Sequence, residues 1–291
     1  MKVATAAYNL DWLDSWAQYE DKLGRWVSDA AGQGAELLVY PEYGAMELST
    51  LDGVDVAGDL ERSIRAVSDR MEAARALHQR LAQEYKTYIL GASAPIVDEP
   101  GRPVNRAVLY APDGGQDHQD KQIMTRFERE DWDIAPGGPL KLFDTALGKI
   151  GVLICYDSEF PLLGHALSEA DLILVPSCTE ALAGYWRVRI GAMSRALENQ
   201  CVTVMASLVG DNDWSEAVDK NTGTGGIFGP PDKGFPATGV LAEGALNQPG
   251  WTYADIDLSA IAEVRTDGHV LNRTHWEEQS PRVDSVTLSR L

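Results

Sequence analysis

The sequence is poor in cysteine, histidine and basic side chains, and each shortage excludes a class of protein. Its 291 residues include three cysteines, five histidines, and 25 Lys or Arg against 44 Asp or Glu. The widely spaced Cys155, Cys178 and Cys201 fit neither a disulfide framework nor a zinc spacing, so we expect a reducing, cytoplasmic setting and no metal. The net charge of −19 repels phosphate backbones, so no nucleic-acid partner is expected.

Long hydrophobic runs are also missing. A membrane-spanning helix needs roughly 20 consecutive apolar residues, and no stretch of this chain approaches that length. The N-terminal stretch meets Asp11 and Asp14 too early for the apolar segment of a secretory signal, and we interpret it as a first strand. The sequence therefore predicts a protein without a membrane partner.

What the sequence does contain is an alternation of strand-like and helix-like segments. Apolar, β-branched runs predict strands at 2–8, 36–42, 87–93, 105–112, 140–155 (two strands joined near Gly148), 171–177, 200–207, 224–228, 238–241 and 251–258. Apolar residues at three- and four-residue steps predict helices at 12–31, 59–84, 160–169 and 185–199. The turn at 113–115 predicts a hairpin. With no linker or repeat, we expect a single α/β domain.

Chemically capable side chains follow three of these segments. Glu42 follows one strand, Cys155 ends another, and Lys121 lies between them in the sequence. Strand ends on a rigid sheet are where active-site groups converge. A thiol needs a base to become a nucleophile, and no histidine here has the context of one, whereas a buried carboxylate can serve. A lysine ammonium would then stabilise the oxyanion.

Taken one at a time, these residues have plainer interpretations. A cysteine that ends an apolar run is usually a small buried hydrophobic residue, although it is also a candidate redox thiol, metal ligand or nucleophile. Glutamate after a strand and lysine in a polar segment are usually solvated. Only the combination and order of the three favour catalysis.

The order and local sequence of these segments resemble the nitrilase, or carbon–nitrogen hydrolase, superfamily. The resemblance is carried by VYPEYG (39–44), DKQIMTRFE (120–128) and GVLICYDSEFP (151–161), and it extends to RALENQCVTVMAS (195–207). It departs at the lysine segment, where QDKQIM replaces the Tyr-Arg-Lys-x-His-Leu of many amidases. This chain is therefore identified with a divergent, amidase-like branch.

The resemblance implies a four-layer αββα sandwich and a Glu–Lys–Cys site without a cofactor. Glu42 would be the general base, Lys121 the oxyanion stabiliser, Cys155 the nucleophile, and the Tyr156 N–H a second oxyanion donor. The substrate would be a small amide or carbamoyl compound. The hydrolase domain would span 1–267, and the tail 268–291 would lie at the interface of a homodimer or a higher homo-oligomer.

Many family members carry a second glutamate near the triad. The motif before Pro136 and Gly137 places it on Glu130, which we prefer to Glu128 because a hydrogen bond to Lys121 would bring its charge into the site. The candidate pocket residues are the aromatic and polar side chains next to the triad: Tyr43, Trp132, Tyr156, Glu159, Phe160, Thr179, Glu180, Tyr185 and Trp186.

Four alternatives stay open at this point. The same triad hydrolyses nitriles, and the scaffold could serve a non-catalytic interaction protein. Cys155 could be a redox-sensing thiol, which predicts sulfenylation without an acyl adduct. A metal site at His275, Glu277 and Glu278 is a further hypothesis, although such a run in a tail is usually a solvated charge cluster.

Overall fold

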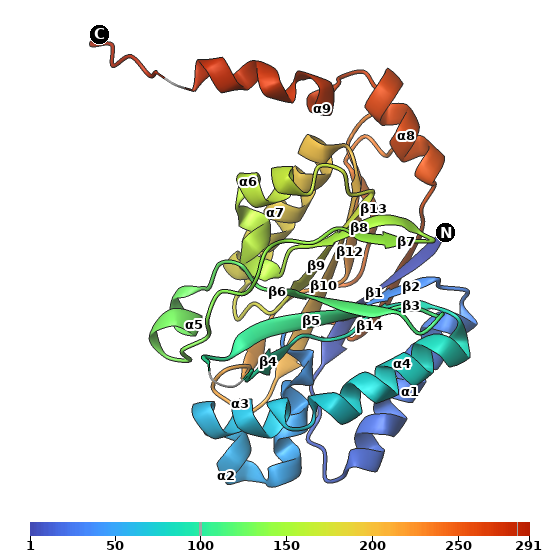
Figure 1. Cartoon of the computed structure of the whole chain (residues 1–291), viewed down its shortest axis with the longest axis vertical. Coiled ribbons are helices and arrows are strands. Elements are labelled where there is room, and N and C mark those ends of the chain that lie inside the picture. The colour runs from blue at the N-terminus through green and yellow to red at the C-terminus, as the bar shows by residue number, and fades with distance from the viewer. Residues whose placement is uncertain (99–100, 284) are drawn as a thin grey trace.

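The computed structural model describes residues 1–98, 101–283 and 285–291, and these form a mixed α/β domain (Figure 1). Its strands are β1 (Lys2–Asn9), β2 (Leu37–Val39), β3 (Tyr88–Leu90), β4 (Ala94–Ile96), β5 (Val104–Tyr110), β6 (Gln116–Asp120), β7 (Phe143–Thr145), β8 (Gly148–Val152), β9 (Leu172–Ser177), β10 (Val202–Asp211), β11 (Lys220–Asn221), β12 (Gly226–Phe228), β13 (Val240–Glu243) and β14 (Gly250–Asp255).

Most of the helices lie on the two outer sides of the strands (Figure 1). They are α1 (Trp16–Gly32), α2 (Val54–Ala57), α3 (Leu60–Ser68), α4 (Met71–Tyr85), α5 (Arg126–Glu130), α6 (Pro161–Ala166), α7 (Leu182–Asn199), α8 (Leu258–Asp267) and α9 (Asn272–His275), with 3-10 segments η1 (Gly44–Asp52), η2 (Cys155–Glu159) and η3 (Trp276–Arg282). Within the described ranges, no helix is long and apolar enough to cross a membrane.

The strands form one hydrogen-bonded network that divides at β1. Its order is β4-β5-β3-β2-β1-β10-β9-β8-β7, and the run from β3 to β8 is parallel throughout. Strand β1 pairs with β14 along Lys2 to Ala7, but with β10 only from Ala7 to Asn9. Because β10 pairs with β1 only at the carboxyl end of β1, the two halves of the network separate and face each other.

Side-chain alternation along the strands builds the layers. On β1, Ala4, Ala6 and Tyr8 pack with the apolar faces of α1, α3 and α4 in one core cluster, whereas Val3 belongs to a second cluster. That second cluster also contains residues of β8, β9, β10 and α7. Successive strand residues point to opposite faces, so the half of the network that contains β1 contributes side chains to both clusters. The result is the predicted αββα sandwich, with α1–α4 on one side and α6 and α7 on the other (Figure 1).

The predicted elements are confirmed with one clear exception. The single helix expected over 59–84 is wrong, because α3 ends at Ser68 and α4 begins at Met71. Arg70 lies in the break, and its guanidinium donates to both carboxylate oxygens of Asp52, at 2.8 and 2.6 Å. The apolar spacing continues across the break, so periodicity alone does not reveal it.

The C-terminal segment extends from the body after α8 (Figure 1). It contains α9 and η3, and the Trp276 ring stacks on His165 with 4.2 Å between ring centroids. Beyond them, Val286 and Leu288 are almost fully exposed. The domain boundary at 267/268 and the interface role of the tail stay predictions.

Two helical glycines provide a matched test of how α7 positions the segment that follows β8. A Cβ on Gly191 would lie 2.8 Å from the Ser158 carbonyl oxygen, whereas a Cβ on Gly24 in α1 has no atom within 4 Å. We expect Gly24→Ala to raise the free energy of unfolding by up to about 1 kcal/mol. Gly191→Ala should lower it, because the Ser158 backbone must move. Denaturant unfolding measures both, and equal effects would contradict this packing.

Candidate active site

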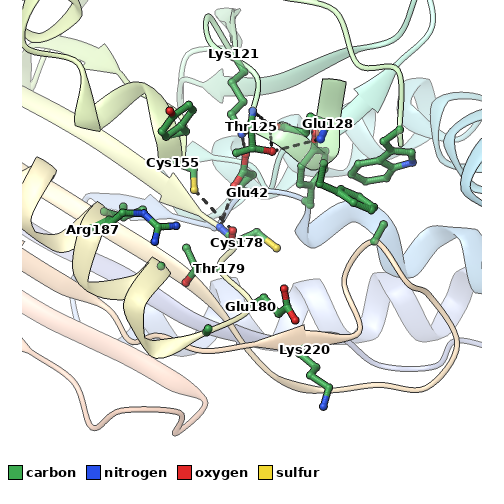
Figure 2. Close-up of a pocket in the computed structure, with 18 of the residues that line it drawn as sticks. Glu42, Lys121, Thr125, Glu128, Cys155, Cys178, Thr179, Glu180, Arg187 and Lys220 are labelled. Carbon is green, nitrogen blue, oxygen red and sulfur yellow. Dashed lines mark hydrogen bonds and ion pairs between the residues drawn. The ribbon is translucent and has the colours of Figure 1, made fainter. Parts of the chain in front are cut away.

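Three segments bring their polar residues to one edge of the sheet. Glu42 follows β2, Lys121 directly follows β6, and Cys155 begins η2 after β8. The carboxyl ends of β2 and β8 lie at the same edge because both strands belong to the parallel run. The structure therefore brings the three predicted residues together (Figure 2). All three are buried.

The Lys121 ammonium is held between two carboxylates. Its Nζ donates to Glu42 Oε1 at 2.7 Å and to both oxygens of Glu128 at 2.9 and 2.7 Å. The Asn105 amide also donates to Glu42 Oε1, at 2.9 Å, and the Cys178 N–H donates to Glu42 Oε2 at 3.0 Å. Every oxygen of Glu42 thus has a donor, which fixes the carboxylate in one orientation.

Burial and charge shift the pKa values of this cluster in different directions. Burial alone would lower the pKa of Lys121, but the charges of Glu128 and Glu42 outweigh it and raise that pKa well above its usual range. For Glu128, burial is outweighed by Lys121 and by hydrogen bonds, and its pKa is lowered. Burial raises the pKa of Glu42 despite Lys121. Lys121 and Glu128 are therefore charged, and of the two carboxylates that contact Lys121, Glu42 is the better able to accept a proton.

Cys155 has an unusual backbone and a protonated thiol. Its φ of 50° lies in the left-handed region, which residues other than glycine rarely adopt. The thiol donates to the Cys178 carbonyl, with 3.7 Å between sulfur and oxygen. Burial, followed by the charge of Glu42, raises the pKa of Cys155 well above its usual range. A base must therefore remove its proton before the sulfur attacks.

Asp157 joins the lysine segment to the cysteine segment. Its carboxylate accepts from the N–H groups of Gln122 and Ile123, the shortest at 2.8 Å, and from the Ile154 N–H at 3.2 Å. Burial raises its pKa to about 7. This buried carboxylate sets the position of Lys121 relative to Cys155.

A pocket of about 520 Å³ opens over the cluster. Of the predicted residues, the triad, Tyr43, Trp132, Tyr156, Glu159, Thr179 and Glu180 line it. Phe160, Tyr185 and Trp186 are not among its lining residues: Phe160 packs against Tyr156, Tyr185 donates to Glu243, and Trp186 is half exposed on α7. For these three, the predicted pocket position is corrected.

The preference for Glu130 as the second glutamate is also corrected. Its carboxylate binds Arg126 at the surface, whereas Glu128 contacts Lys121 and accepts from the Tyr43 hydroxyl at 2.7 Å. The capping box at Thr125 explains the difference, because Thr125 donates to Glu128 and fixes it at the third position of α5. Two residues later, the helix has turned the side chain of Glu130 outward.

Sequence reasoning did not find several other residues of the site. Asn105 and Cys178 hold Glu42, and Arg187 of α7 lines the pocket. Cys178 directly follows β9, so the strand-end argument used for Cys155 would have found it. Asn105 and Arg187 lie inside regular elements and give no such signal. Across the described ranges, no group of three or more His, Cys, Asp or Glu side chains is arranged to hold a metal ion.

An αββα sandwich with a buried cluster of glutamate, lysine and cysteine at its sheet edge defines a class of hydrolases. Residues 2–266 match the carbon-nitrogen hydrolase family, and the chain belongs to this family of the nitrilase superfamily. It is therefore a carbon–nitrogen hydrolase.

Curated relatives include hydrolases and amidases. The chain is 32% identical over 277 residues to the probable hydrolase YhcX of Bacillus subtilis (strain 168), covering 93% of this chain but 52% of that protein. It is 27% identical over 259 residues to omega-amidase NIT2 of Danio rerio, covering 84% and 86%. The same identity over 259 residues relates it to the deaminated glutathione amidase of Synechocystis sp. (strain PCC 6803 / GT-S), covering 81% and 85%.

Solved structures share the fold. A mutant of the amidase from Nesterenkonia sp. AN1, in a structure with acrylamide added at the active-site cysteine, superimposes with a TM-score of 0.71 at 23% identity, covering 92% of this chain and 97% of that one. Nit3 of Saccharomyces cerevisiae gives 0.71 at 23% identity, with 91% and 93% covered.

The two glutamates of α5 form a matched pair for mutation. Glu128→Gln removes a charged partner of Lys121 and lets the ammonium shift, so we expect hydrolysis of the best amide substrate to slow roughly 10- to 100-fold. Glu130→Gln removes the same charge from the surface and should stay within about twofold. The measurement is kcat/KM. A larger loss of kcat/KM in Glu130→Gln than in Glu128→Gln would show that Glu130 is the second glutamate of the site.

Asp157→Asn tests the link between Lys121 and Cys155. One amide oxygen cannot accept from all three N–H groups, so the free energy of unfolding should fall by about 1–3 kcal/mol. The exposed Asp144→Asn is the control, with an expected change within about 0.5 kcal/mol.

The effect of Asp157→Asn should also depend on pH. Burial raises the pKa of Asp157 from about 3.8 to about 7, so this group contributes less to stability as pH rises through that window. The asparagine variant has no such titration, and the stability gap between wild type and variant should narrow from pH 4 to pH 8. A gap that widens would show that the folded carboxyl has a lowered pKa.

Proposed function

We propose that this chain hydrolyses a non-peptide carbon–nitrogen bond of a small amide or carbamoyl-type substrate through a thioester on Cys155. The observation that carries the proposal is the buried contact of Lys121 with Glu42 beside the Cys155 thiol, at the floor of a pocket. In the proposed roles, Cys155 is the nucleophile, Glu42 the general base and Lys121 the oxyanion stabiliser. Glu128 positions Lys121 and keeps it charged.

The first half-reaction forms the acyl-enzyme. Rotation about the Cβ–Sγ bond turns the thiol proton from the Cys178 carbonyl towards Glu42, which accepts it as sulfur attacks the carbonyl carbon. The oxyanion that forms is stabilised by the Lys121 ammonium together with the Tyr156 N–H. Glu42 then donates the proton to the leaving nitrogen, so ammonia or an amine departs and the thioester remains.

The second half-reaction uses water and the same base. Glu42 accepts a proton from water as the oxygen attacks the thioester carbon, and the resulting oxyanion again faces Lys121. The bond to sulfur breaks, Glu42 returns the proton to Sγ, and the carboxylic acid leaves. The raised pKa of Glu42 suits this exchange, because it brings the carboxylate closer in basicity to the groups with which it trades protons.

The relatives support an amide in preference to a nitrile. Two of them, from Danio rerio and Synechocystis, are named as amidases, and this chain covers more than four-fifths of each. The Bacillus subtilis hydrolase is longer, since this chain spans 52% of it. The activity of that whole protein therefore does not decide between an amide and a nitrile for this chain. Homo-oligomerisation through the tail 268–291 and a cytoplasmic location belong to the proposal as expectations.

Intact-mass spectrometry tests the mechanism. Incubated with a panel of small amides, carbamoyl compounds and nitriles, wild type should gain the mass of the acyl group on Cys155. Glu42→Gln should gain it far more slowly, because the same base serves acylation and deacylation. Cys155→Ala should lose at least about 10³-fold in ammonia release, whereas the buried Cys201→Ala should retain activity. Ammonia release by Cys155→Ala at the wild-type rate would refute the mechanism.

A further inference from the structure

The charges that line the pocket are unbalanced. Six carboxylates and three cations line it: Glu42, Glu128, Glu159, Glu180, Glu216 and Asp219 against Lys121, Arg187 and Lys220. Since this pocket contains the proposed nucleophile, the substrate must occupy it. The charges of the lining residues therefore constrain the charge of the substrate.

At the floor, the lysine offers no spare positive charge. Lys121 donates to Glu42 and to both oxygens of Glu128, so its charge is already matched by buried carboxylates within 3 Å. A substrate anion placed here would face two carboxylates for one ammonium. The floor therefore accommodates the neutral reacting carbonyl and the transient oxyanion, and does not provide a resting site for an anionic group.

On the α7 side, one further cation is matched by one carboxylate. Arg187 Nε lies 3.5 Å from Glu159 Oε1, and Arg187 is the more exposed of the two side chains. The pair contributes no net charge to the pocket.

On the side of the pocket away from Lys121, carboxylates outnumber cations (Figure 2). Glu180 lies between β9 and α7, and Glu216 and Asp219 lie between β10 and β11, with Lys220 next to them. Among the described residues, no side chain forms a hydrogen bond or an ion pair with any of these three carboxylates. Figure 2 shows Glu180 and Lys220 beyond Thr179, on the side of the pocket away from Lys121.

Two further features point to the same type of ligand. Tyr43 and Trp132, whose ring centroids lie 4.7 Å apart, line the pocket with Phe127 and Tyr156, and aromatic faces attract cations as well as aliphatic chains. Glu180 and Lys220 also border a second hollow of about 460 Å³, lined by Asp211 and three uncharged polar side chains. The two hollows share Glu180 and Lys220, so this acidic wall borders both of them.

We propose that the substrate is an elongated amide with a cationic group, an ammonium or a guanidinium, at the end opposite its scissile bond, and that Glu180 and Asp219 bind this group. The inference rests on the proposed hydrolysis of amides and adds the charge and shape of the substrate. The negative charge of Glu216 adds to the electrostatic potential on the same side of the pocket. The net charge of −19 on the chain acts in the same direction, since it attracts cations over longer range.

The test uses three linear primary amides built on the same pentanamide chain: pentanamide itself, its ω-amino analogue and its ω-carboxy analogue. At low ionic strength we expect kcat/KM to be about tenfold higher for the ω-amino amide than for pentanamide, and lowest for the ω-carboxy amide. Glu180→Gln and Asp219→Asn should each lower kcat/KM for the ω-amino amide roughly threefold more than for pentanamide. The advantage should shrink in high salt, because exposed charges are screened.

The exposed Glu84→Gln on α4 is the matched control and should alter none of the three rates. Equal rates for pentanamide and its ω-amino analogue, or equal losses for both in the two variants, would overturn the cationic substrate and leave amide hydrolysis intact. If the ω-amino amide releases no ammonia, the inference fails; if Cys155→Ala releases ammonia at the wild-type rate, the proposed function fails as well.

Discussion

A lysine ammonium enclosed in the protein interior is the constraint on which the rest of this site depends. Lys121 is 1% exposed, and an isolated charge at that depth would cost several kcal/mol in lost hydration. Two carboxylates offset that cost, and each arrives from a different segment, one after β2 and one from α5. Because Lys121 donates to both carboxylates in the interior, the ion cluster constrains where both segments lie.

That arrangement also separates the roles of two chemically identical side chains. Glu128 accepts from Lys121, Tyr43 and the N-terminus of α5, and its pKa is lowered, so it stays an anion. For Glu42, burial outweighs the attraction of Lys121 and its pKa is raised, so it is the better proton acceptor of the two. The sheet makes this division possible, since the parallel run from β3 to β8 brings Glu42 and Cys155 to one edge without any direct connection between their segments.

Much of the fold and the central triad could be predicted from the sequence, because they depend on local patterns. Apolar runs that stop at Pro41 or at Cys155 mark strand ends, and the order of the three motifs carries the resemblance to the family. The wrong choice of Glu130 came from helix phase: two residues along α5 separate a buried carboxylate from a solvated one. Residues such as Asn105 act through partners distant in the chain, and nothing in their neighbourhood signals this.

The spacing of the site along the chain has a consequence for how the protein acquires reactivity. Glu42, Lys121 and Cys155 lie on segments that are remote in sequence, and β1 connects the two halves of the strand network by pairing with both β2 and β10. In a partly assembled sheet, Lys121 is an ordinary solvated lysine and Cys155 an ordinary thiol without a base. The proposed hydrolytic activity therefore requires an assembled sheet, because the cluster depends on pairings between strands that are remote in sequence.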